Sequence, residues 1–182
     1  DGYLVAPSGD LLPERGMNMN IGAIWDKKVS HGMFQIEVNL FGNYLKDMVR
    51  QTRNIIQTQY ENFGEMRSLG VESEVKADML SWLYGYANIT FQDLRDTRKY
   101  EPDSEVPNPT RRLRMPNIPY LMANGGLEFH KENLFGVRNT NTRLFTDASF
   151  VEEYFYDFEQ SIYQERRIPR SFRVDVGVEY SM

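Results

Sequence analysis

Met33-Phe34-Gln35-Ile36-Glu37-Val38-Asn39-Leu40-Phe41-Gly42-Asn43-Tyr44-Leu45 alternates between apolar and polar side chains. Phe34, Ile36, Val38, Leu40 and Tyr44 share one parity, and Gln35, Glu37, Asn39 and Asn43 share the other. Because a strand points successive side chains to opposite faces, the run predicts a strand with one apolar and one polar face. Between Phe34 and Tyr44, only Phe41 breaks the pattern. Strands of soluble domains usually have about 5–6 residues. Long, two-faced strands with aromatic residues are typical of a β-wall between lipid and water.

The composition excludes several classes of protein. The chain has 182 residues and no cysteine, so it has no disulfide framework. Its formal net charge of −5 argues against a nucleic-acid partner. No run approaches the roughly 20 apolar residues of a membrane helix. A β-barrel remains compatible with this sequence, because it places apolar residues only at every second position.

The same alternation recurs along the chain, near residues 17–25, 68–77, 82–93, 119–130, 141–154 and 171–181. Short connections are predicted near 26–32, 78–81 and 131–137, and long ones near 46–65, 94–118 and 155–170. Residues 46–65 are polar and mixed, and strand extensions are an alternative there. Alternate connections of an antiparallel meander lie on the same rim. The fold class is therefore all-β, an antiparallel meander forming part of a transmembrane β-barrel. It has about seven long strands, with short turns on one rim and long loops on the other.

The chain shows no catalytic constellation, so we expect no enzyme, no cofactor and no metal site. His31 and His130 are isolated near predicted short turns and are interpreted as surface residues. Glu72 and Glu74 share one strand face, and lining of a lumen or of solvent is favoured over acid–base chemistry.

The candidate binding residues are arginines in the long connections: Arg111, Arg112, Arg114, Arg166 and Arg167, with Arg170 close by. Guanidinium groups suit anionic ligands such as carboxylates. The alternative for the first three is pairing with Asp103 and Glu105, or with anionic lipopolysaccharide. A nearby aromatic cluster is interpreted as a girdle at the barrel rim, with a ligand stack as the alternative; it comprises Tyr154, Phe155, Tyr156 and Phe158.

Several motifs resemble those of one family. Leu11-Leu12-Pro13-Glu14-Arg15-Gly16-Met17-Asn18-Met19-Asn20-Ile21-Gly22-Ala23 is similar to the L-x-P-E-x-x-x-x-x-E-I-G segment of TonB-dependent outer-membrane receptors, with Asn20 where the family often has Glu. Three further matches follow in family order: Asn62-Phe63-Gly64 before Gly70-Val71-Glu72-Ser73-Glu74, then Arg114-Met115-Pro116-Asn117-Ile118-Pro119, then Ile168-Pro169-Arg170. Together they span nearly the whole chain, and the resemblance is to Bacteroidetes-like members.

The resemblance implies a 22-stranded barrel with an N-terminal plug domain. It implies uptake of a scarce nutrient, such as a ferric siderophore, haem or cobalamin, energised through TonB in the outer membrane of a Gram-negative bacterium. The implied partners are outer-membrane lipid, the TonB complex through the plug region, and a small nutrient ligand such as an iron chelate. We expect residues 1–182 to be one part of the barrel domain, with the plug and the last strands lying outside this chain, because both ends look cut.

Two other classes of protein share the alternating pattern. A soluble β-sandwich, such as a carbohydrate- or ligand-binding module, would turn the apolar faces inward against a second sheet. A passive porin or adhesin barrel would have the same wall without a plug. Two outcomes distinguish the membrane wall from the sandwich. A sandwich buries five aliphatic side chains that a membrane wall leaves uncovered: Ile36, Val38, Val71, Val174 and Val176.

Overall fold

The computed structural model describes residues 4–5, 11–30, 32–53, 57–101, 104–161 and 164–182, and these are mostly strands. Seven long strands carry the fold: β2 (Arg15–Val29), β3 (Gly32–Arg53), β4 (Gln57–Leu80), β5 (Leu83–Asp96), β6 (Leu121–Glu132), β7 (Asn141–Val151) and β10 (Ser171–Ser181). The shorter elements are β1 (Leu4–Val5), the 3₁₀ turn η1 (Leu134–Gly136), β8 (Tyr154–Ser161) and β9 (Gln164–Ile168). No helix in the described residues is long and apolar enough to cross a membrane.

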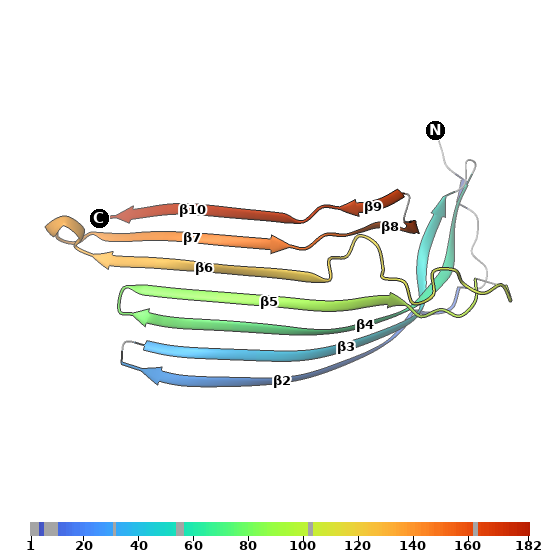
Figure 1. Cartoon of the computed structure of the whole chain (residues 1–182), viewed down its shortest axis with the longest axis horizontal. Coiled ribbons are helices and arrows are strands. Elements are labelled where there is room, and N and C mark those ends of the chain that lie inside the picture. Colours follow the sequence, from blue (N-terminus) through green and yellow to red (C-terminus); the bar gives the residue numbers. More distant parts are fainter. Residues whose placement is uncertain (1–3, 6–10, 31, 54–56, 102–103, 162–163) are drawn as a thin grey trace.

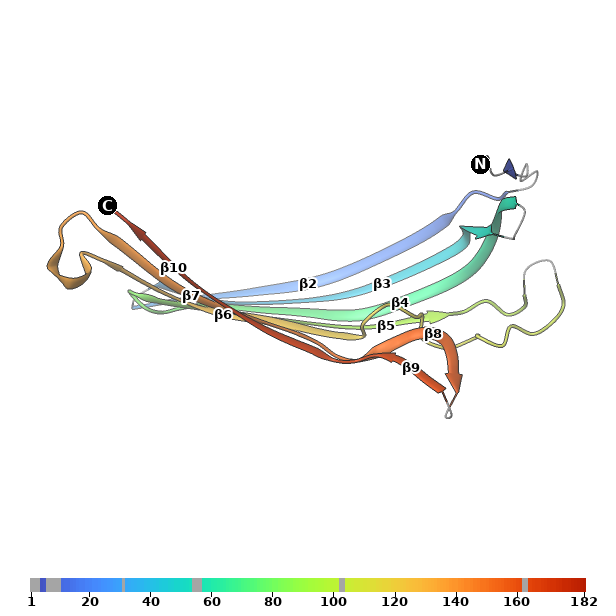
Figure 2. The same ribbon diagram turned by 90° about the horizontal axis from the view of Figure 1, so that it is seen from above.

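The long strands form one antiparallel sheet in the order β10-β7-β6-β5-β4-β3-β2. β1 pairs in parallel with the start of β4, and β8 pairs with β9 in a separate hairpin. Figure 1 shows the strands side by side, and Figure 2 shows that they lie in a single curved layer. The predicted meander of about seven long strands is therefore confirmed.

The strand register gathers side chains of one parity on one face of the sheet. Ile36 pairs with Val75, Val75 with Ala87, Ala87 with Gly125, Gly125 with Ala148 and Ala148 with Val174. We call this side the apolar face. The opposite side, the polar face, carries Glu37, Glu74 and Asn88 in equally direct register. The predicted two-faced strands are therefore aligned across the whole sheet.

Nothing covers the apolar face in the part of the chain that the structure describes. No described hydrophobic residue is buried, and Val174 and Val176 expose 51% and 70% of their surface. A soluble β-sandwich would bury these side chains against a second sheet. The structure therefore contradicts the sandwich alternative.

Aromatic pairs mark both ends of the apolar face. Trp25 packs edge-on against Phe34 at the short-turn end, with ring centroids 5.9 Å apart, and Phe91 packs against Tyr120 at the loop end at 6.2 Å. On β3 the apolar parity runs from Phe34 to Tyr44, about 33 Å along a strand at ~3.3 Å per residue. A tilt of about 40° reduces this to a height of about 25 Å, which is the height of the apolar band of a membrane barrel.

Aromatic rings on the polar face cover glycines of neighbouring strands. A Cβ added at Gly70 would overlap the Phe41 ring, and one added at Gly177 would overlap the Phe145 ring. Phe41 therefore breaks the sequence pattern because it packs over Gly70, its register partner.

The two rims differ as predicted, although several boundaries were wrong. The described short turns include Ser30, residues 81–82 and residues 133–140, on the left in Figure 1. The predicted long connection at 46–65 is wrong and the alternative of strand extensions is confirmed, because β3 and β4 continue to pair as far as Arg53 and Thr58. Polar strands beyond a membrane need no apolar face, so the alternation that identifies a strand is missing there. Only residues 54–56 separate the two strands, and they lie outside the described residues.

The remaining corrections concern the ends of strands. The predicted loop 155–170 contains the β8–β9 hairpin, and Tyr154 begins β8 rather than ending β7. The segment predicted at 119–130 forms a strand at 121–132, and the turn predicted at 78–81 falls at 81–82. The irregular connection between β5 and β6 is confirmed.

Candidate ligand-binding site at the loop rim

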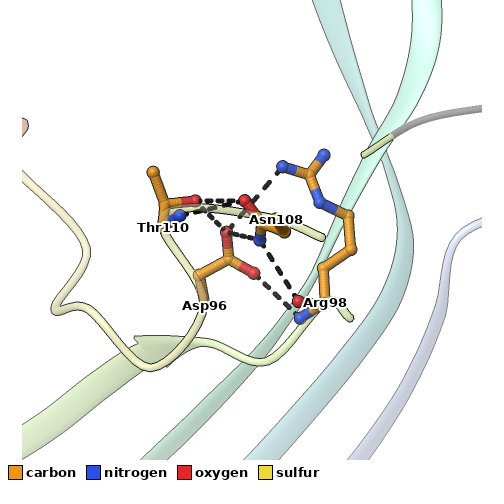
Figure 3. Close-up of polar contacts among 4 residues, drawn as sticks. All are labelled: Asp96, Arg98, Asn108 and Thr110. Atoms are coloured by element: carbon orange, nitrogen blue, oxygen red, sulfur yellow. Dashed lines mark hydrogen bonds and ion pairs between the residues drawn. The ribbon is translucent and has the colours of Figure 1, made fainter. Parts of the chain in front are cut away.

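A buried polar cluster holds the long connection between β5 and β6 at its base. Asp96, only 3% exposed, accepts hydrogen bonds from Thr110 Oγ1 at 2.7 Å and Asn108 Nδ2 at 2.9 Å (Figure 3). The backbone N–H of Arg98 donates to the other carboxylate oxygen at 2.9 Å, and the Arg98 guanidinium lies 3.9 Å from Asp96. A buried carboxylate is stable only with such partners. The cluster therefore ties Asp96 and Arg98 at the start of the connection to Asn108 and Thr110 further along it.

The returning part of this loop pairs with the end of β5. Met115 N–H donates to the Leu94 carbonyl at 2.9 Å, and Arg112 N–H donates to the Asp96 carbonyl at 2.8 Å. Arg95 and Arg114 form an isolated antiparallel bridge. Arg112 itself adopts a left-handed conformation with φ of 69°, which for a residue other than glycine is held by its surroundings. The arginine run is thus fixed in space by backbone hydrogen bonds.

Arg111 and Arg112 line a hollow of about 550 Å³, together with Arg67 and Arg95 from the strands. We call it the arginine hollow. Its main carboxylate is Asp93, which lies 2.6 Å from Arg95 Nε, 3.3 Å from Arg114 Nε and 3.9 Å from Arg67 Nη2.

On β5, Asp93 lies beyond Phe91, the last apolar side chain of the apolar face, and so outside the membrane-spanning part of that strand. The hydrogen bond from Arg95 is the main cause that holds the pKa of Asp93 below its usual range. The carboxylate therefore stays ionised at neutral pH, and the cations in the hollow outnumber it. The arrangement suits an anion.

Arg114 and Arg167 line a second hollow, of about 220 Å³, although 53 positions separate them in the sequence. The Arg114 guanidinium lies 4.4 Å from the centre of the Tyr120 ring, and the Arg167 guanidinium lies 4.9 Å from that of Phe155. Arg167 also pairs with Glu153. We call it the aromatic hollow. Stacked arginines with an adjacent carboxylate can hold a planar or anionic group.

The structure separates the predicted arginines into these two hollows. Arg166 is exposed and lines neither of them. Sequence reasoning missed Arg67 and Arg95. The available signal was their parity, because both continue the apolar parity of their strands at positions where a charge is unexpected.

Two of the other residues named in the sequence analysis line a hollow, and the remaining described ones lie apart from both. Tyr154 and Phe155 line the aromatic hollow, Tyr156 is exposed, and the side chain of Phe158 lies outside the described part. His130 is exposed at the end of β6, and His31 lies outside the described residues. Among the described residues, no group of three or more His, Asp or Glu side chains is arranged to hold a metal ion.

The polar face below the rim is a hydrogen-bonded wall. Arg143 on β7 bridges two neighbouring strands, because its guanidinium lies 2.7 Å from Glu128 on β6 and 3.4 Å from Glu179 on β10. The Tyr86 hydroxyl donates to Asp147 at 2.7 Å. Glu72 and Glu74 line a shallow hollow with Glu37 on the same face, in agreement with their interpretation as lining residues. A face made of paired charges and hydrogen-bonded side chains is suited to contact with water.

Comparison with known proteins gives a family and a fold. A family model described as "TonB dependent receptor-like, beta-barrel" matches residues 1–182. A solved structure, the ferric yersiniabactin uptake receptor FyuA from Yersinia pestis, superposes with a TM-score of 0.66 at 18% identity, over 97% of this chain and 25% of that one. The chain thus spans about a quarter of that receptor's length. Comparison with curated protein sequences gives no match.

Proposed function

Because the chain belongs to the TonB-dependent receptor-like β-barrel family, we propose that it forms part of the wall of a receptor that imports a scarce nutrient with energy relayed by TonB. Barrels of this family lie in the outer membrane of Gram-negative bacteria, and they are transporters rather than enzymes. The observation that carries the proposal is the seven-stranded wall itself, which is apolar on one face and polar on the other. Residues 1–182 are then one part of the barrel domain, and the plug that contacts TonB belongs to another segment.

The proposed nutrient is a small iron chelate or a compound of similar size, such as a ferric siderophore, haem or cobalamin. The name of the similar structure, a ferric yersiniabactin uptake receptor, supports the iron-chelate class. The two basic hollows at the loop rim support an anionic nutrient, because each presents guanidinium groups beside exposed loop residues.

We assign the first contacts with the nutrient to the loop arginines. Arg111 and Arg112 are exposed in the arginine hollow, and Arg114 and Arg167 lie beside aromatic rings in the aromatic hollow. Arg166 is exposed next to Arg167 and completes the set. Guanidinium groups bind carboxylates through paired hydrogen bonds, which gives orientation as well as affinity.

Transport is tested in cells that express the full-length receptor and lack their own receptors for the probes. The probes are a ferric catecholate siderophore, a ferric hydroxamate siderophore, haemin and cyanocobalamin, each radiolabelled. The proposal expects accumulation of at least one probe, and loss of that accumulation when TonB is deleted. Accumulation that continues without TonB would identify a passive porin. Accumulation of none of the probes would contradict the nutrient classes named here.

The arginine assignment is tested on the purified full-length receptor with the probe that is transported. The double variant Arg111→Gln/Arg112→Gln should weaken binding by at least about tenfold, because the loss of one hydrogen bond to a charged group typically weakens binding by about that factor. Arg138→Gln is the matched control, because Arg138 is an exposed arginine on the opposite rim. Equal affinity of the double variant and the wild type would remove the assignment.

A further inference from the structure

A row of basic side chains crosses four neighbouring strands on the apolar face. It comprises Arg15 in β2, Lys46 in β3, Arg67 in β4 and Arg95 in β5. Arg15 pairs with Lys46, and Arg67 pairs with Arg95, in direct register. Arg67 pairs with Tyr44 on β3, two residues from Lys46, so the row is continuous. We call it the basic row. None of its members was among the predicted ligand contacts.

The basic row keeps the parity of the apolar residues that precede it. Tyr44 is followed two positions later by Lys46, and Leu69 is preceded two positions earlier by Arg67. The row therefore begins where the apolar band ends, at the loop rim. Two residues correspond to about 7 Å along a strand. The cations thus lie just past the hydrocarbon boundary, where a charged side chain on the lipid face is tolerated.

Two carboxylates lie among these cations. Glu65 lies 3.5 Å from Lys46 Nζ and accepts the Tyr44 hydroxyl at 3.1 Å. Asp93 is shared between Arg67, Arg95 and the loop residue Arg114. The cations outnumber the carboxylates, so the basic row has a net positive charge. The side chains of Lys46, Arg67 and Arg95 still expose 46%, 45% and 36% of their surface.

We propose that the basic row binds the phosphate groups of the glycolipid that forms the outer leaflet of the Gram-negative outer membrane. The long-loop rim of such barrels faces the cell exterior, so the row lies at the headgroup level of that leaflet. Arginine side chains match phosphate oxygens through paired hydrogen bonds. The acyl chains of the same lipid molecule would then lie along the apolar band, which is continuous with the row. Arg67 and Arg95 also line the arginine hollow, whereas Arg15 and Lys46 line neither hollow and belong to the lipid site alone.

The test uses the full-length receptor in detergent micelles, titrated with bisphosphorylated lipid A, dephosphorylated lipid A and phosphatidylglycerol, with bound lipid counted by native mass spectrometry. The double variant Arg67→Gln/Arg95→Gln should lose about 30-fold in affinity for bisphosphorylated lipid A, from the usual contribution of two cations near a membrane surface. Arg173→Gln is the matched control, because Arg173 is an exposed arginine on the polar face.

A second double variant controls for misfolding of the first, because Asp93 loses two ion-pair partners in Arg67→Gln/Arg95→Gln. Arg15→Gln/Lys46→Gln leaves Asp93 paired and should also lower the affinity by at least tenfold. Nutrient binding should be unchanged in Arg15→Gln/Lys46→Gln, because Arg15 and Lys46 line neither the arginine hollow nor the aromatic hollow. This variant therefore separates the lipid proposal from the arginine assignment above. Unchanged lipid A affinity in both variants would overturn the proposal. Equal binding of dephosphorylated lipid A or of phosphatidylglycerol to the wild type would also overturn it.

Discussion

Leu40 offers a direct test of which face of the sheet lies in lipid. It lies on the apolar face of β3, exposes 52% of its surface, and pairs with Ile21 and Val71 on the two neighbouring strands. Four residues separate it from Tyr44, about 13 Å along the strand, or about 10 Å in height at a 40° tilt. In an apolar band of about 25 Å, Leu40 is then close to the midplane.

Leu40→Arg should therefore cost about 2–4 kcal/mol, the penalty for an arginine on the lipid face at the midplane of a membrane barrel. Even the lower value shifts the folding equilibrium about 30-fold. The measurement is the guanidinium midpoint for unfolding of the full-length receptor from phospholipid bilayers. The folded fraction is read from tryptophan fluorescence and from the migration of unheated samples in SDS gels.

The neighbouring residue supplies the matched control. Asn39 lies on the polar face and donates to Glu72 at 3.4 Å, with Glu37 on the same strand face. Asn39→Arg therefore places the same side chain beside carboxylates in water, and the free energy of unfolding should change by less than about 0.5 kcal/mol. A large loss for Asn39→Arg with none for Leu40→Arg would show that the two faces have been assigned the wrong way round.

Gly177→Ala should destabilise the receptor by about 1–3 kcal/mol, because the new Cβ overlaps the Phe145 ring. Adding Phe145→Leu should recover most of that loss in a double-mutant cycle of unfolding free energies, and additive losses would contradict the ring-over-glycine contact. Asp96→Asn replaces one of the two accepting carboxylate oxygens by an NH₂ donor, so the buried polar cluster loses hydrogen bonds and trypsin should cleave after Arg111 at least tenfold faster. An unchanged rate would refute the role of this cluster in holding the loop. Asp93 has a lowered pKa, so its contribution to stability is complete above the ordinary value of 3.8 and is lost as the pH falls through the lower folded value. Unfolding midpoints measured below pH 4 should thus fall more steeply for the wild type than for Asp93→Asn, and parallel curves would contradict this.

The strands that cross the apolar band were predictable because burial in lipid imposes a strict period of two. The run from Phe34 to Tyr44 and the run from Phe172 to Tyr180 show that period and form β3 and β10 as expected. Residues 46–65 carry no such constraint, since both faces of the strand extensions meet water, and their pairing was not visible in the sequence.

The loop arginines illustrate a different limit. Their chemistry was recognisable from residue type, but their neighbours come from distant segments: Arg111 and Arg112 share a hollow with Arg67, and Arg114 shares one with Arg167. Backbone hydrogen bonds join the loop to the end of β5, and Asn117 N–H donates to the Phe155 carbonyl of β8 at 2.7 Å. No local pattern encodes them.

Alternation along the chain by itself determined the fold class, the two faces and the unequal rims, because every second side chain of a strand lies on the same face and in the same environment. The tertiary structure alone decided which strand lies beside which, and therefore which charges meet. The register aligns Arg15 with Lys46 and Arg67 with Arg95, and it places Phe41 over Gly70. Cross-strand partners are set by backbone pairing between segments far apart in sequence, and the pattern within one segment does not identify the segment with which it pairs.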